Sequence, residues 1–156
     1  DILLSDAQTV VCLGDSFDDL DAEASLRTDE LSWLTRLQAG RRWIWIEGNH
    51  DPGKFSSGGT HLQSLPIQPL TFRHIPVAAT SGEVAGHYHP KVQISLRGRP
   101  FAKPCFLVDW DRLILPAFGT YTGGLKTQSL ELTGLMRPEA LAILTGKQAR
   151  PIPMPR

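Results

Sequence analysis

The sequence predicts an α/β fold in which a strand–helix–strand unit is followed by a half rich in short strands. Apolar runs at residues 10–13 and 42–46 flank a segment, residues 22–39, whose leucines recur at helical spacing. Residues 70–115 hold several short apolar segments separated by turns, which predicts a second, antiparallel sheet. The chain has 156 residues, 41 % of them apolar, and this composition suits a single domain over residues 1–156.

The first half is expected to form a buried parallel unit. Val10–Leu13 predicts a buried strand that ends in a polar loop. Gly40 is a typical helix stop after the helix expected over residues 22–39. The continuous apolar run of Arg42–Ile46 predicts a strand that is buried on both faces.

The second half changes character. Residues 53–69 are rich in Gly, Ser and Pro and predict a loop, and the tail Arg150–Arg156, with three prolines, predicts an extended segment. No long helix is expected after residue 70. Strands are expected at Leu70–His74, Glu83–His89, Val92–Arg97, Cys105–Val108 and Leu113–Leu115.

Charge and cysteine content limit the classes of function. The formal net charge is zero, so affinity for a phosphate backbone would have to come from a local patch or from bound metals. Cys12 and Cys105 lie in apolar runs and predict buried thiols rather than a disulfide, which fits a reducing compartment. No apolar run approaches the ~18 residues of a membrane span, and no signal-peptide pattern opens the chain. A cytoplasmic location without membrane association is therefore expected.

Two polar loops follow the first two predicted strands. In the segment Gly14–Asp19, Asp15 could bridge two cations, although Asp and Ser are also good caps for the helix that follows. In Gly48–Asp51, Asn49 can offer its carbonyl oxygen to a metal, and His50 can donate a proton or stabilise charge on a phosphoryl oxygen. The alternative for the second loop is a turn rich in Asn and Asp.

A pair of histidines gives the strongest local signal. In an extended segment, His87 and His89 would point to the same side and form a chelating pair, and Pro90 would bias His89 toward the extended region. The alternative is an exposed pair on an edge strand. His74, taken alone, is more often a structural histidine than a ligand. Together these groups occur in order at strand ends, and nitrogen and oxygen ligands without a thiolate suit manganese, iron or zinc.

These blocks resemble the signature of a known superfamily. Gly14-Asp15-x-x-Asp18, Gly48-Asn49-His50-Asp51 and Gly86-His87-x-His89 are similar to the calcineurin-like metallophosphoesterases, and His74 falls where that superfamily places a lone histidine. The segments at residues 11–17, 43–46, 82–90 and 115–124 are most similar to the PdeM subfamily of ligase-associated DNA damage response endonucleases. The genes of that subfamily occur with those of a DNA ligase and a helicase.

The resemblance implies a four-layer α/β/β/α sandwich with two divalent metal ions, manganese first and zinc or iron as alternatives. Asp15 would bridge both ions. One ion would be completed by Asn49, His74 and His87, and the other would be bound by His89.

The resemblance also implies catalytic roles and one departure. His50 would contact the scissile phosphate and assist the leaving group, and Asp18 would orient His50, with Asp19 as the competing candidate. The superfamily opens with a strand and an Asp-x-His block that this chain lacks ahead of Asp15. We therefore expect a domain without its N-terminal strand.

The expected function is that of a metal-dependent phosphodiesterase, an endonuclease that acts on DNA in repair. Two alternatives remain open. One is a phosphoesterase that acts on a small molecule or nucleotide, because the metal site would be the same. The other is an inactive binding domain, because the first block of metal ligands is missing.

Overall fold

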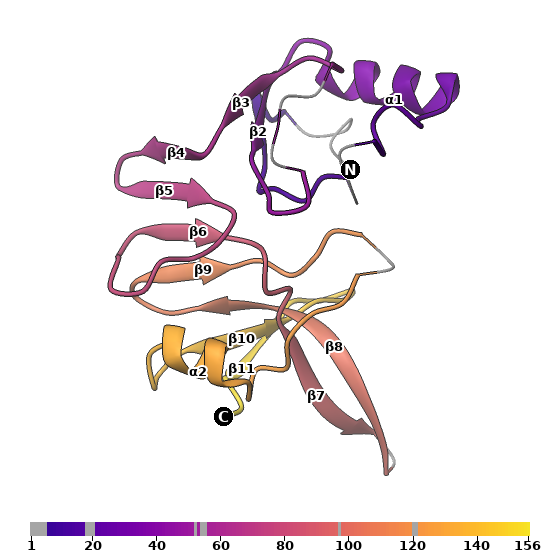
Figure 1. Cartoon of the computed structure of the whole chain (residues 1–156). Helices are drawn as coiled ribbons and strands as arrows, with labels where there is room; N and C mark the ends of the chain where they lie inside the picture. The colour runs from indigo at the N-terminus through magenta and orange to yellow at the C-terminus, as the bar shows by residue number, and fades with distance from the viewer. Residues whose placement is uncertain (1–5, 18–20, 52, 54–55, 97, 120–121) are drawn as a thin grey trace.

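The computed structural model describes residues 6–17, 21–51, 53, 56–96, 98–119 and 122–156. This part of the chain forms two sheets with one helix beside each (Figure 1). The predicted mixed α/β class is therefore confirmed.

The smaller sheet is the predicted strand–helix–strand unit with one added strand. It has the order β1 (Thr9–Cys12), β2 (Arg42–Ile46) and β3 (Thr60–Leu62), and all three strands are parallel. The connection from β1 to β2 contains α1 (Thr28–Gln38), which is shorter than the predicted helix; at its start the Glu30 side chain accepts a hydrogen bond from the backbone N–H of Arg27 (2.9 Å). Cys12 pairs with Trp45, so the loops after β1 and β2 leave the sheet side by side.

The larger sheet is mixed rather than antiparallel. Its order is β11-β10-β8-β9-β6-β5-β4, with β7 paired to β8. The expected all-antiparallel arrangement is wrong at its centre, because β5–β6 and β6–β9 are parallel pairs. The bounds are β4 (Ser64–Ile67), β5 (Leu70–Arg73), β6 (Glu83–Ala85), β7 (Lys91–Leu96), β8 (Arg99–Val108), β9 (Arg112–Ile114), β10 (Leu141–Leu144) and β11 (Arg150–Pro153).

Several segments differ from the prediction for physical reasons. The predicted loop at residues 53–69 contains β3 and β4, which are too short, at three and four residues, to carry a clear periodicity. The proline-rich tail forms β11, which lies at the edge of the sheet, where proline is tolerated. The short helix α2 (Leu130–Leu135) was not expected; Ser129 caps it by accepting a hydrogen bond from the backbone N–H of Leu132 (3.3 Å).

Two hydrophobic clusters stabilise the layers. The large-sheet core lies between the larger sheet and α2. Its buried members are Val92, Cys105, Leu107, Ile114, Leu132, Met136, Ala140, Ala142 and Met154. The inter-sheet core joins β2 to β4 and β5. It contains Ile44, Ile46 and Leu65, with Val11, Leu13, Leu62 and Phe72 packed against them.

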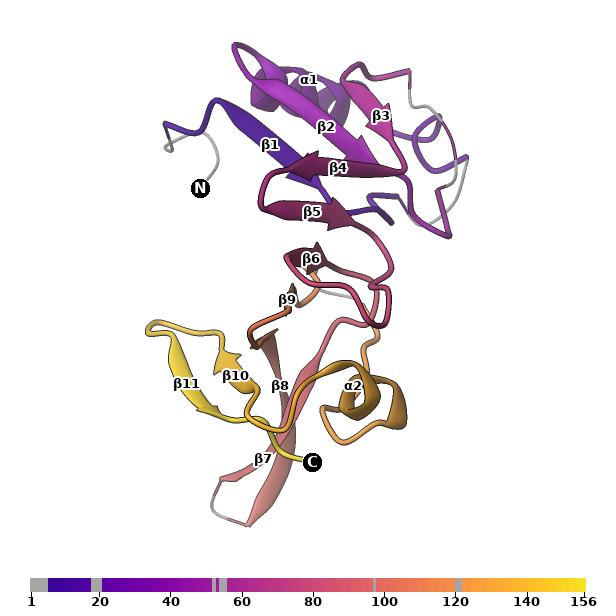
Figure 2. The ribbon, with the colours of Figure 1, turned by 90° about the vertical axis from the view of Figure 1, so that its left-hand side faces the viewer.

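The two cores lie on opposite faces of the larger sheet. Phe72 faces the smaller sheet, whereas the alternation of side chains along β9 turns Ile114 to the other face, where α2 packs. Figure 2 shows α1 behind β2 and β4 in front of it. The layers therefore follow the order α1, smaller sheet, larger sheet and α2, as expected for an α/β/β/α arrangement.

Candidate metal centre

The predicted ligands meet where the two sheets face each other at the ends of their parallel strands. Asp15 lies in the loop after β1, and Asn49 lies in the loop after β2. His74 directly follows β5, and His87 lies two residues beyond β6. Each sheet therefore contributes two of the four side chains.

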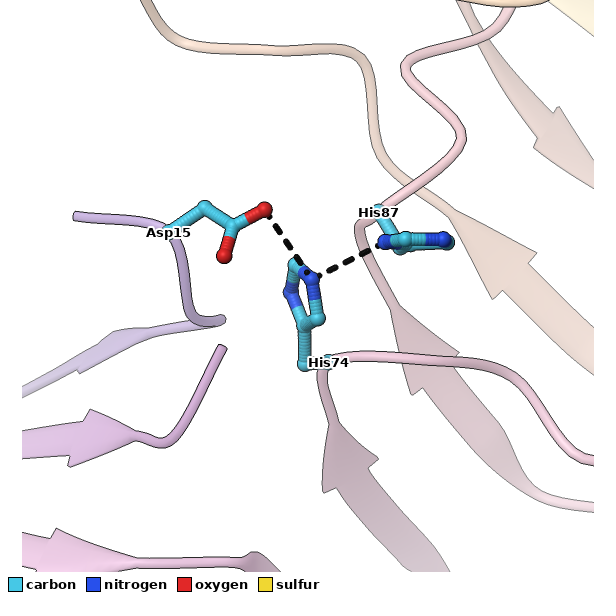
Figure 3. A group of neighbouring side chains, drawn as sticks. All are labelled: Asp15, His74 and His87. Carbon is cyan, nitrogen blue, oxygen red and sulfur yellow. Dashed lines mark hydrogen bonds and ion pairs between the residues drawn. The ribbon is translucent and has the colours of Figure 1, made fainter. Parts of the chain in front are cut away.

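Three of these side chains converge on one atom of the fourth, the Nε2 of His74. This nitrogen lies 2.9 Å from Asn49 Oδ1, 3.2 Å from Asp15 Oδ2 and 3.0 Å from His87 Nδ1. Figure 3 shows Asp15 and His87 on either side of the His74 ring. One ligand atom each from Asp15, His74 and His87 lies within 4.8 Å of the others, a spacing that could hold a metal ion.

The backbone fixes the tautomer of His74. Its ring is buried, and Nδ1 lies 2.7 Å from the carbonyl oxygen of Leu13. A carbonyl oxygen can only accept, so Nδ1 carries the proton and donates it. The Nε2 lone pair of a neutral ring then faces two oxygen atoms that are themselves acceptors. A cation at this point would satisfy all of them, and the hydrogen bond to Leu13 is the kind that orients metal-binding histidines.

A buried carboxylate that the sequence reasoning did not single out organises both loops of the smaller sheet. Asp51 Oδ1 accepts hydrogen bonds from the backbone N–H groups of Asp15 (3.0 Å) and Gly48 (2.9 Å). Its Oδ2 accepts from the backbone of Ser16 (2.6 Å) and Phe17 (3.3 Å). In sequence Asp51 looked like one more turn residue before a proline. Only its complete burial identifies it as the group that positions Asp15.

Close backbone approach constrains the same loops. A Cβ at Gly48 would lie 2.2 Å from both the backbone nitrogen and Oδ1 of Asp15. Asp15 Oδ1 also accepts a hydrogen bond from the backbone N–H of His50 (2.9 Å). This bond engages one oxygen of Asp15 and leaves Oδ2 directed toward His74.

The predicted extended His-x-His pair is wrong in its geometry. Strand β6 ends at Ala85, and the chain turns so that the backbone N–H of Tyr88 donates to the carbonyl of Gly86 (2.7 Å). His87 has φ 58° and His89 has φ 45°, both in the left-handed region. Strand alternation therefore does not place the two rings on one side. Positive φ in a residue other than glycine is costly and often marks a functional turn.

Electrostatics favour the neutral form of the two histidines. Burial lowers the pKa of His87 below its ordinary value, and His74, His89 and His50 lower it further, against the opposing charge of Asp15. Burial likewise lowers the pKa of His89, although the charge of Asp15 opposes the shift. A neutral imidazole is the form that binds metal, so the site disfavours the proton that would compete.

The remaining predicted residues lie at the rim or beyond. His89 is half-buried beside the cluster, and His50 is exposed at its mouth. Asp18, predicted to orient His50, and its competitor Asp19 lie outside the described residues. A hollow with a volume of about 350 Å³ adjoins Asn49 and His74, and Arg73 also lines it.

Comparison with known proteins gives one informative likeness. No protein-family model matches the chain, and no curated protein matches it. Among solved structures, the crystal structure of Pseudomonas putida nuclease MPE is similar, with a TM-score of 0.72 and 26 % sequence identity. The likeness covers 94 % of this chain and 71 % of that chain. In the described part of the chain, no helix is long and apolar enough to cross a membrane.

Proposed function

We propose that this chain is a metal-dependent phosphodiesterase that cleaves nucleic acid, of the calcineurin-like metallophosphoesterase type. The observation that carries the proposal is the convergence of Asp15, Asn49 and His87 on the Nε2 atom of His74. The likeness to the Pseudomonas putida nuclease supports nucleic acid as the substrate class. The resemblance of the sequence to the PdeM subfamily adds manganese as the metal and DNA repair, alongside a DNA ligase and a helicase, as the context.

The donor set fits a divalent cation. Asp15 Oδ2, Asn49 Oδ1, His74 Nε2 and His87 Nδ1 would hold one ion, and Asp15 with His89 would contribute to a second. Bound there, divalent ions would supply Lewis acidity to activate water and to offset charge on the phosphoryl oxygens.

The residues of this chain contribute preorganisation. The carbonyl of Leu13 locks the His74 ring, so its lone pair needs no reorientation. Asp51 and the backbone N–H of His50 hold the Asp15 loop and its carboxylate in place. The His50 side chain is exposed, and its backbone N–H is bonded to Asp15; from this loop the ring would donate a proton to the leaving oxygen.

The test combines metal content with turnover. Manganese would be added to the wild-type chain and to His87→Ala, with His61→Ala as a matched control. His61 suits this purpose because it lies in β3, where its ring stacks on Trp45 of β2, outside the cluster. We expect His87→Ala to lose bound metal and to lower kcat for bis-p-nitrophenyl phosphate and for single-stranded DNA by about 100-fold or more. His61→Ala should retain both properties.

Other outcomes separate the alternatives. Hydrolysis of monoesters without hydrolysis of diesters would replace the proposal with a small-molecule phosphatase. Bound metal without turnover of any phosphoester would indicate a binding domain. A wild-type chain that binds no metal would refute the proposal.

A further inference from the structure

Phe118 is the most exposed large apolar side chain in the described part of the chain. Its relative exposure is 101 %, so the ring contacts almost nothing in the protein. Leaving an aromatic ring in water forgoes the stabilisation that burial would give it. A single exposed apolar side chain is ordinary on a protein surface, so the place of this ring in the fold decides whether it has a role.

The loop that carries Phe118 is tied to the metal centre at its start. The backbone N–H of Leu115 donates to the carbonyl of Ala85 (2.8 Å), two residues before His87. Figure 3 shows the segment that follows β9 running past His87. Phe118 comes three residues after Leu115.

The loop is tied to the same segment at its end. The backbone N–H of Leu125 donates to the carbonyl of Tyr88 (2.9 Å), and Lys91 Nζ donates to the carbonyl of Thr122 (3.0 Å). Gly124 lies so close to His89 that a Cβ there would be 2.2 Å from the His89 carbonyl oxygen. The loop is therefore bonded at its start to the end of β6 and at its end to the segment that presents His87 and His89, so Phe118 lies in a loop at the same end of the sheet as these histidines.

A second exposed aromatic provides an internal comparison. Trp110 is 81 % exposed and precedes β9, whereas Phe118 follows it. The carbonyl of Asp111 accepts a hydrogen bond from Glu83 (3.0 Å), at the start of β6 and opposite to the end that leads to His87. The two rings are similar in exposure, but only Phe118 lies at the end of the sheet that carries the metal ligands.

We propose that Phe118 is a stacking surface for an unpaired nucleobase next to the scissile phosphate. This inference rests on the proposed nuclease function. Metals at the Asp15–His87 cluster would fix the phosphate, and the base of a flanking nucleotide could then extend toward the loop that carries Phe118. Stacking on an aromatic face tolerates any base, but it requires that the base be free of its duplex partners. The enzyme should therefore favour single-stranded substrates.

The kinetic test compares Phe118→Ala with Trp110→Ala on a single-stranded oligothymidylate in the presence of manganese. We expect Phe118→Ala to raise KM about 10-fold and Trp110→Ala to leave it unchanged. Phe118→Trp should restore the wild-type KM, whereas Phe118→Leu, which is apolar but not aromatic, should not. An oligonucleotide with abasic positions on both sides of the cleaved bond should be bound equally by wild type and Phe118→Ala.

A second measurement avoids turnover altogether. With manganese present and a hydrolysis-resistant phosphorothioate backbone, an oligonucleotide containing 2-aminopurine should lose fluorescence on binding to the wild-type chain and retain it with Phe118→Ala, because stacking quenches this base. Equal KM values for wild type, Phe118→Ala and Trp110→Ala, or equal quenching by wild type and Phe118→Ala, would overturn the stacking role while leaving the nuclease function intact. A wild-type chain that hydrolyses neither bis-p-nitrophenyl phosphate nor DNA would instead overturn the proposed function, and this inference with it.

Discussion

The two sheets contribute equally to the metal centre but are stabilised very differently. Among the described residues, nine are buried in the core that the larger sheet forms with α2. In the same part of the chain, the core that the smaller sheet shares with its neighbour has three buried members, Ile44, Ile46 and Leu65. His74 and His87 therefore stand on a well-packed support, whereas Asp15 and Asn49 depend on a small contact and on the hydrogen bonds of Asp51. The geometry of the site should be easiest to disturb from the smaller sheet.

The largest effect is expected from Asp51→Asn. The substitution places an NH₂ group against backbone N–H donors that now share a buried carboxylate. We expect the free energy of unfolding to fall by about 3 to 5 kcal/mol, and metal affinity to fall by about 10- to 100-fold. Urea unfolding and a manganese titration would measure the two quantities.

Asp109→Asn is the matched control on the larger sheet. Asp109 also accepts backbone hydrogen bonds, from Asp111 (2.8 Å), Arg112 (2.9 Å) and Arg137 (2.8 Å), but it is only half-buried and lies at the β8–β9 turn, away from the ligands. Its substitution should cost about 1 kcal/mol and leave metal affinity unchanged. Equal losses of metal affinity in the two variants would contradict the asymmetry between the sheets.

An intermediate effect is expected from truncating one leucine in each core. Leu107→Ala in the large-sheet core should lower the free energy of unfolding by about 3 kcal/mol, and Leu65→Ala in the inter-sheet core by about 2 kcal/mol, because Leu65 retains some exposure. Metal affinity should instead fall more in Leu65→Ala than in Leu107→Ala, because Leu65 supports the placement of the smaller sheet. Chemical denaturation and metal titration of both variants test this, and a larger loss of affinity in Leu107→Ala would count against it.

The smallest effect concerns the two thiols, one in each sheet. Burial raises the pKa of Cys12 and of Cys105 from 9.0 to about 11. A raised pKa means that the folded state favours the protonated thiol, so this contribution to stability is complete below pH 9 and is lost as the pH rises from 9 to about 11. Alkylation at about pH 8 should be slow in the native protein.

The order of alkylation adds information about the two sheets. Cys12 is half-buried in β1, whereas Cys105 is fully buried in the large-sheet core. Cys12 should therefore react first, as followed by mass spectrometry of the labelled peptides. Faster labelling of Cys105 would show that the larger sheet opens more readily.

Local sequence patterns are sufficient to predict several of the elements. The apolar run of Arg42–Ile46 is β2 with the same bounds, and Val10–Leu13 is β1 to within a residue at each end. The sequence also predicts candidate site residues at 14–15, 48–50, 74 and 86–89, because polar groups there follow the expected strands. Strands β3 and β4 are not predicted from the sequence, because β3 pairs with a strand distant in sequence. In β4, which pairs with β5, the segment is short and Leu65 is its one buried residue.

How those groups meet depends on contacts between segments distant in sequence. The convergence on His74 Nε2 requires two sheets to face each other, and sequence spacing contains no information about that approach. The positive φ of His87 and His89 replaced the expected extended pair, because the chain must turn where β6 ends. Asp51 and Phe118 are an ordinary turn residue and an ordinary apolar residue in sequence. The burial of Asp51 and the exposure of Phe118 distinguish these residues from their neighbours in sequence, and burial is a property of the folded chain as a whole.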